Sequence, residues 1–179
     1  MYETAMLTPD VSARDHAQGP AAAPITLVEY GDYQCPYCGA AYPEIKRLQK
    51  ALGKKLRFVF RNFPLTQSHP YALIAAEAAE AAAFQGKFWE MHDMIYENQD
   101  ELEPDILLTW AETVGLDLEK FGTAIRQEEI AKKIKEDRKS GIASGVNGTP
   151  CLFINGSRYD GTPDYESLKP ILDEYLSNR

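Results

Sequence analysis

The sequence predicts an α/β fold in which a small core of strands and helices carries an inserted all-helical subdomain. Two observations lead to this prediction: β-type runs occur only toward the two ends of the chain, and about seventy residues between them have helical periodicity. A third is the pair Asn155-Gly156, a strong hairpin signal between two short β-type runs. The 179 residues therefore form one domain with a large insertion.

The first part of the chain predicts a βαβ unit. Residues 1–24 show no periodicity and are expected to form an arm that leads into the fold. Residues 25–30 are apolar and partly β-branched, which predicts a strand. Residues 37–52 have apolar positions at helical spacing and stop at Gly53, a residue that favours a helix C-cap. Residues 56–60 then predict a second strand.

The remainder of the chain is helical until the β-type runs near the C-terminus. Helices are predicted at 71–84, 87–96, 104–114, 118–126 and 128–142, with breaks near glycines. Residues 151–154 and 157–159 predict the hairpin, and an apolar stripe from Leu168 to Leu176 predicts a final helix. The expected organisation is an arm at 1–24, a core formed by 25–69 and 146–179, and a helical insertion at 70–145.

Charge and composition argue against several classes of function. The chain has 27 acidic and 19 basic residues, so its net charge of −8 repels phosphate backbones and anionic lipid surfaces. Neither nucleic acid nor a membrane is therefore expected as a partner. The sequence as written shows no signal-peptide pattern, which predicts a cytoplasmic protein, or a periplasmic or other extracytoplasmic one if a signal segment has been removed.

Cys35 and Cys38 are the strongest chemical signal. They form a CxxC pair where a predicted strand ends and a predicted helix begins. Unpaired N–H groups and a partial positive charge at a helix N-terminus stabilise a thiolate, so Cys35 is expected to be the exposed nucleophile. Cys38, one turn further on, is expected to be more buried and to resolve a mixed disulfide. The alternative is half of a zinc site, but the third cysteine, Cys151, has no CxxC partner, so no metal is expected.

Four segments of the sequence carry distinctive motifs. Residues 28–38 are VEYGDYQCPYC, 61–65 are RNFPL, 85–89 are QGKFW, and GTP at 148–150 is followed by FING at 153–156. Together they resemble the DsbA-like thiol-disulfide oxidoreductases of thioredoxin fold, over about residues 20–176. The resemblance implies a thioredoxin-like fold with a helical insertion, and it implies no organic cofactor.

The resemblance also implies a substrate-binding set around the first cysteine. Pro150 is implied to be a cis-proline that packs beside Cys35, and Thr149 to offer its backbone to an extended substrate segment. Pro36 and Tyr37, between the two cysteines, complete the set. The Pro-Tyr pair differs from the Pro-His pair of DsbA and matches the one common in glutaredoxins, so a weaker oxidant is expected.

One acidic residue has a predicted catalytic role. Glu29 occupies the position at which the family often holds a buried acid, and it is expected to carry the proton of Cys38. The alternative is a solvated glutamate on an edge strand. Asp32 is expected to be an ordinary loop acid, and neither His69 nor His92 stands in a catalytic pattern.

The predicted function is thiol-disulfide exchange between the Cys35-Cys38 pair and cysteines of protein substrates, through a mixed disulfide. Glutathione or a redox partner protein is a further candidate partner. Two other functions stay open: a glutathione-linked reductase or transferase of the same fold, and a non-catalytic chaperone or binding module. Cys151 is interpreted either as a space-filling residue of a strand or as an auxiliary redox thiol.

Overall fold

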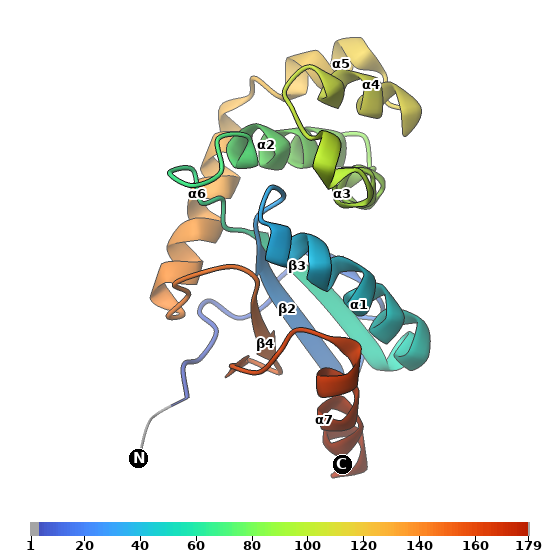
Figure 1. The fold of residues 1–179 in the computed structure, drawn as a ribbon, viewed down its shortest axis with the longest axis vertical. Helices are drawn as coiled ribbons and strands as arrows, with labels where there is room; N and C mark the ends of the chain where they lie inside the picture. Colours follow the sequence, from blue (N-terminus) through green and yellow to red (C-terminus); the bar gives the residue numbers. More distant parts are fainter. Residues whose placement is uncertain (1–3, 179) are drawn as a thin grey trace.

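A five-stranded mixed sheet forms the centre of the molecule in the computed structural model, which describes residues 4–178 (Figure 1). The strands lie in the order β1-β3-β2-β4-β5. They are β1 (His16–Gln18), β2 (Ile25–Gly31), β3 (Leu56–Asn62), β4 (Cys151–Ile154) and β5 (Ser157–Tyr159). Only β2 and β3 pair in parallel; the other neighbours are antiparallel. The predicted α/β class is confirmed.

The βαβ unit places the N-terminus of the first helix at the end of the central strand. Helix α1 (Pro36–Leu52) follows β2 after a short turn, and Gly53, with φ +52°, ends it. Pro36 is tolerated as the first residue because N–H groups there have no intrahelical partner. Helix α7 (Tyr165–Ser177) packs against α1, and Asp164 caps it by accepting a hydrogen bond from the N–H of Ser167.

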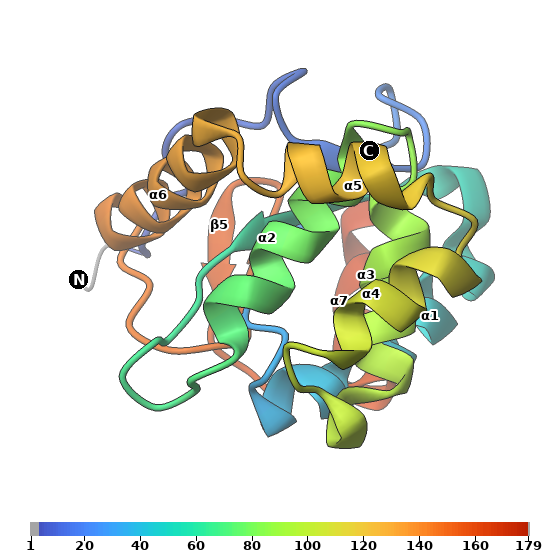
Figure 2. The ribbon, with the colours of Figure 1, turned by 90° about the horizontal axis from the view of Figure 1, so that it is seen from above.

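The helical insertion lies over one end of the sheet. Its helices are α2 (Ala72–Ala83), α3 (Phe88–Glu97), α4 (Ile106–Thr113), α5 (Leu118–Ala124) and α6 (Glu128–Ala143). Helices α2 to α5 form a cap above the sheet, and α6 returns along its side (Figures 1 and 2). The buried alanine face of α2 packs against both α3 and α6. The predicted helices are confirmed, and their bounds shift by at most two residues at either end.

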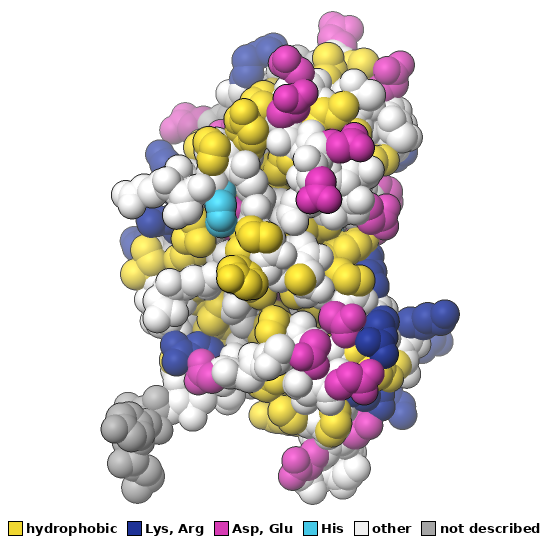
Figure 3. Space-filling view, viewed as in Figure 1, with side chains coloured by type: hydrophobic (Ala, Val, Ile, Leu, Met, Phe, Trp, Pro, Cys, Tyr) yellow, Lys and Arg dark blue, Asp and Glu magenta, His cyan; other side chains and the backbone are white. Residues whose placement is uncertain are grey.

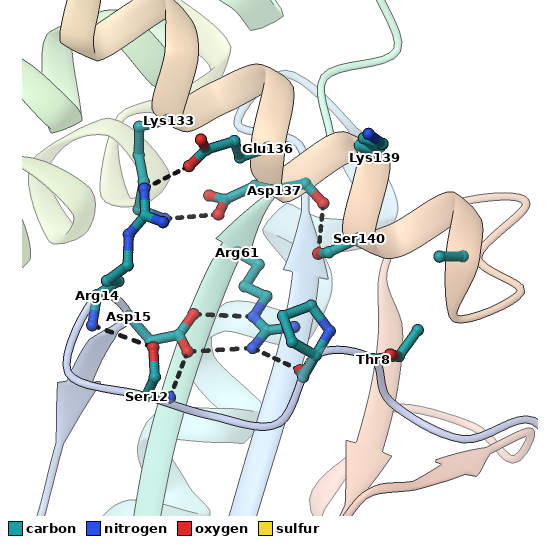
Figure 4. Close-up of a pocket in the computed structure, with 12 residues that line it drawn as sticks. Thr8, Ser12, Arg14, Asp15, Arg61, Lys133, Glu136, Asp137, Lys139 and Ser140 are labelled. Atoms are coloured by element: carbon teal, nitrogen blue, oxygen red, sulfur yellow. Dashed lines mark hydrogen bonds and ion pairs between the residues drawn. The ribbon is translucent and has the colours of Figure 1, made fainter.

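The segment expected to be an arm contributes a strand to the sheet. β1 pairs antiparallel with the outer edge of β3, in the register Ala17↔Val59. Arg61 fastens the chain before β1: its Nε and one terminal nitrogen donate to Asp15, and the same terminal nitrogen donates to the carbonyl oxygen of Pro9 (Figure 4). A strand of three residues has no readable alternation, so this pairing has no local signal in the sequence. The division into arm, core and insertion stays a prediction.

The C-terminal hairpin brings a second loop to the end of β2. β4 pairs antiparallel with β2, in the register Tyr30↔Cys151, so the residues just before β4 lie where β2 ends. Asn155 and Gly156 both have positive φ, +47° and +86°, as a two-residue hairpin turn requires. The predicted hairpin is confirmed.

Candidate active site

Cys35 and Cys38 lie at the junction of β2 and α1. Cys35 is the N-cap residue of α1, and Cys38 is in its first turn. Cys35 is only 3% exposed and Cys38 is fully buried. The expectation that Cys35 is exposed is therefore wrong, because the loop before β4 lies against it; the expected order, with Cys38 the more buried, is correct. Both are free thiols in this structure.

The loop before β4 brings Thr149 and Pro150 to the first cysteine. The Sγ of Cys35 lies 3.5 Å from the carbonyl oxygen of Thr149, to which it donates a hydrogen bond when it is protonated. The Thr149–Pro150 peptide bond is cis, as the resemblance implies. Antiparallel pairing of β4 with β2 produces this contact between residues that are far apart in the chain.

The two thiols have opposite acidities. A hydrogen bond from the Cys38 thiol lowers the pKa of Cys35 to about 5; burial opposes this, and the backbone N–H groups of Tyr37 and Cys38 assist it. Burial raises the pKa of Cys38 well above its ordinary value, and the negative charges of Cys35 and Glu29 add to the effect. At neutral pH one thiol is thus ionised and its neighbour holds its proton.

Glu29 is buried in the central strand, with 2% of its surface exposed. β2 lies between β3 and β4, so the alternative of a solvated glutamate on an edge strand does not apply. Burial raises the pKa of Glu29 to about 8, and the negative charge of Cys35 contributes. Its Oε1 has no hydrogen-bond partner among the described residues. The carboxyl group is therefore largely protonated at neutral pH.

Several hydrophobic side chains are exposed, and one of them lies between the two cysteines. Tyr37 is 73% exposed. Leu73, 39% exposed, is on the first turn of α2. The start of that helix lies close to the residue before Cys35, because the backbone N–H of Tyr71 donates a hydrogen bond to the side-chain oxygen of Gln34 at 2.6 Å. Figure 3 shows hydrophobic side chains gathered across the middle of one face, between the helical cap and the sheet.

Residues 32–35, between β2 and α1, form the turn that carries Cys35, called the catalytic turn below. Three residues that hold it in place were missed or misjudged from the sequence. Asp32 is not a loop acid in solvent: it is 1% exposed and accepts a hydrogen bond from the backbone N–H of Cys35 at 3.1 Å. His69 donates to the same carboxylate at 2.8 Å. Gln99 is the first residue of the 3-10 turn η2 (Gln99–Glu101), and its side-chain amide donates to the carbonyl oxygens of Tyr33 and Cys35, both at 2.8 Å.

Only one of these three contacts has a local signal. An aspartate two and three residues before the free N–H groups of a helix start is the pattern of an Asx turn, so the role of Asp32 could have been predicted from its spacing to Cys35. The contacts of His69 and Gln99 join segments that the sequence does not connect.

The remaining cysteine and histidine lie in environments of low reactivity. Burial raises the pKa of Cys151 to about 11, so this half-buried thiol keeps its proton at neutral pH. That environment favours the space-filling interpretation over the redox one. His92 is buried, its Nδ1 is 2.9 Å from the hydroxyl oxygen of Tyr33, and burial lowers its pKa well below the ordinary value.

Within residues 4–178, no helix combines the length and apolar character needed to cross a membrane. Across the same residues, no three or more His, Cys, Asp or Glu side chains are grouped so that they could hold a metal ion.

The site thus brings together an ionised cysteine at a helix N-terminus, a protonated partner one turn on and a loop proline, on a sheet with the strand order of the thioredoxin fold. Residues 12–174 match the sequence model of the thioredoxin family. The chain therefore belongs to the thioredoxin family.

Solved structures with the same fold include DsbA-like proteins. The thiol-disulfide exchange protein alpha-DsbA2 from Wolbachia pipientis is 26% identical, with a TM-score of 0.81 over 91% of this chain and 88% of that one. BdbD from Bacillus subtilis, at 23% identity, has a TM-score of 0.83 over 97% of both chains, a likeness of fold. The DsbA-like resemblance is confirmed.

Curated relatives with higher identity have a different name. A Na(+)/H(+) antiporter, NhaA 1, from Salinispora arenicola is 47% identical over 163 residues, which are 91% of this chain and 25% of the antiporter. The chain thus spans about a quarter of the length of these relatives.

Proposed function

We propose that this chain exchanges its Cys35-Cys38 pair with cysteines of protein substrates through a mixed disulfide. The observation that carries this proposal is the unequal acidity of the two thiols, with a pKa of about 5 for Cys35 and a raised pKa for Cys38. One thiol is ready to attack at neutral pH, and the other keeps its proton until it is needed.

The exchange proceeds in two steps. In the first, the Cys35 thiolate attacks a sulfur of a substrate disulfide, a bond forms between Cys35 and the substrate, and one substrate thiolate leaves. In the second, Cys38 loses its proton and attacks the Sγ of Cys35, which releases the other substrate thiolate and leaves a Cys35-Cys38 disulfide. The substrate gains two electrons and the protein loses two. The reverse sequence donates a disulfide.

Glu29 supports the second step as the acceptor of the Cys38 proton. With a pKa of about 8, the group exchanges a proton readily near neutral pH. The negative charge on Glu29 acts on Cys38, which indicates that the two groups are electrostatically coupled. The negative charge of Cys35 contributes to the raised pKa of Glu29. Forming the mixed disulfide removes that charge and lowers the pKa of Glu29, so a larger fraction of the carboxyl is ionised and able to accept the Cys38 proton at that stage.

Substrate binding is assigned to the rim of this site. The backbone of Thr149 would pair with an extended substrate segment, a contact that carries no side-chain selectivity. Pro36, Tyr37 and Pro150 would contact the substrate beside its cysteine; Tyr37 is the most exposed of the hydrophobic side chains. Recognition of this kind suits cysteine-containing proteins of varied sequence.

Reduction of insulin by dithiothreitol tests the proposal. We expect the wild-type protein to accelerate the reduction of insulin and Cys35→Ser to lose this acceleration. Cys38→Ala should accumulate substrate adducts on Cys35 in non-reducing gels, because no second thiol resolves them. Cys151→Ser is the matched control and should retain the wild-type rate. Turnover by Cys35→Ser, or no adduct on Cys38→Ala, would refute the assigned roles.

The direction of exchange and the compartment follow from one measurement. A reduction potential of about −120 to −180 mV would indicate a disulfide donor in an oxidising, extracytoplasmic compartment. One of about −230 to −270 mV would indicate a reductase, as expected in the cytoplasm. Titration in glutathione buffers also tests the glutathione-linked alternative, which the Pro36-Tyr37 pair favours: a stable glutathione adduct on wild-type Cys35 would support it.

A further inference from the structure

The carboxylate of Asp32 joins the catalytic turn to the loop that enters the helical insertion. Its Oδ1 accepts the backbone N–H groups of Gln34 at 2.8 Å and Cys35 at 3.1 Å. Its Oδ2 accepts the backbone N–H of Leu65 and the Nδ1–H of His69, both at 2.8 Å. Each oxygen thus accepts two hydrogen bonds, an arrangement that suits an ionised carboxylate.

An ionised carboxylate in this position needs a positive partner. The Asp32 side chain is 0% exposed, and a buried charge without a counter-charge is costly. Among residues 4–178, His69 is the one cationic side chain within ion-pair distance of it. The His69 side chain is 20% exposed, so it can exchange protons with solvent.

The charge of this pair bears directly on the nucleophile. Asp32 lies three residues before Cys35 and holds its backbone N–H, so an uncompensated negative charge there opposes formation of a second one on the sulfur. Glu29 is a further acidic group coupled electrically to Cys35. Protonated His69 offsets the charge of Asp32, and within residues 4–178 its imidazole makes no hydrogen bond to the reacting sulfur.

We propose that His69 is a positioning residue for thiol exchange: in its protonated form it holds Asp32 ionised against the catalytic turn and so stabilises the Cys35 thiolate. This inference rests on the proposed function and adds a residue to it. The Pro-Tyr pair lacks a histidine between the cysteines, and His69 supplies a positive charge from another loop.

His69→Asn separates charge from hydrogen bonding. The asparagine amide can donate to Asp32 from about the place of Nδ1, but it cannot be protonated. We expect the thiolate absorbance of Cys35 near 240 nm to titrate about one pH unit higher than in the wild type. The glutathione equilibrium should shift several-fold toward the disulfide form, because the reduced form loses stabilisation of its thiolate.

His16→Gln is the matched control. His16 also pairs with a buried carboxylate, that of Glu80, through Nε2 at 2.9 Å, but it is on the edge strand β1. Glutamine keeps a donor near the place of Nε2. We expect this variant to titrate like the wild type. A wild-type Cys35 titration in a folded His69→Asn protein would overturn the proposal.

A measurement on the wild-type protein tests the proposal even if the variants fail to fold. If His69 and the Cys35 thiolate stabilise each other, the effect is reciprocal, so the His69 imidazole should titrate at higher pH in the reduced than in the disulfide form by NMR. Equal midpoints would refute the proposal. Neither titration uses a protein substrate, so an inactive insulin assay with shifted titrations would count against the proposed function alone.

Discussion

The Sγ of Cys35 lies 3.5 Å from the carbonyl oxygen of Thr149, a residue 114 positions away in the sequence, and the thiol form of Cys35 donates a hydrogen bond to it. The contact joins the first turn of α1 to the loop before β4, so the nucleophile and the proposed substrate-binding backbone occupy one site.

The acidity of Cys35 should depend on the side chain at position 38. Cys38→Ala removes the hydrogen bond that contributes most to the low pKa of Cys35, so its titration midpoint should rise from about 5 toward 9. Cys38→Ser retains a hydroxyl donor and should show a smaller rise. Absorbance of the thiolate near 240 nm measures the Cys35 titration midpoint in both variants. Equal midpoints in the wild type and Cys38→Ala would show that the hydrogen bond from Cys38 does not lower the pKa of Cys35.

The stability of the reduced protein should fall between acid and neutral pH because of Glu29. The pKa of Glu29 is about 8 in the folded protein, whereas an ordinary glutamate has a pKa of 4.5. The contribution of Glu29 to the free energy of unfolding is therefore fully present below pH 4.5, and it is lost as the pH rises to about 8. At about 1.4 kcal/mol per pKa unit, the loss is at most about 5 kcal/mol.

Glu29→Gln should remove that part of the pH dependence. Urea unfolding of the reduced wild type and variant at several pH values from 4 to 9 measures it, with the variant gaining relative stability as the pH rises. Parallel pH profiles for the two proteins would show that Glu29 is not the group responsible.

Gln99 should hold the helical insertion to the catalytic turn. Gln99→Ala leaves the carbonyl oxygens of Tyr33 and Cys35 without their donor, so the free energy of unfolding should fall by about 1–3 kcal/mol. Gln127→Ala is the control, since its amide makes one exposed 3.5 Å contact with Thr123, and it should change little. An equal fall in the free energy of unfolding in the two variants would show that Gln99 does not hold the insertion to the catalytic turn.

The segment before β1 should depend on one buried ion pair. Arg61 and Asp15 have side chains 3% and 6% exposed, so Asp15→Ala leaves a buried guanidinium without its partner and should cost about 3–5 kcal/mol. The neighbouring Arg14–Glu136 pair is 72% and 39% exposed, and Glu136→Ala should cost under about 1 kcal/mol. Thermal or urea unfolding distinguishes the two; a small loss for Asp15→Ala would mean that the segment is held by β-pairing alone.

The pattern of apolar residues predicts most elements because helices and strands bury one face at fixed spacing. The run from 25 to 30 predicts β2, and Gly53 and Asn155-Gly156 mark the end of α1 and the hairpin turn through their positive φ angles. The place of Cys35 at a helix N-terminus follows from the same local signals.

The sequence by itself thus determined the α/β class, the helical insertion and the CxxC pair at the start of α1, because each depends on residues close together in the chain. The tertiary structure alone decided the pairing of β1, the burial of Cys35 and the contacts of Asp32 with His69 and of Gln99 with the catalytic turn. These depend on packing between distant segments, which sets the desolvation and hydrogen bonding of each group and leaves no periodic trace in the sequence.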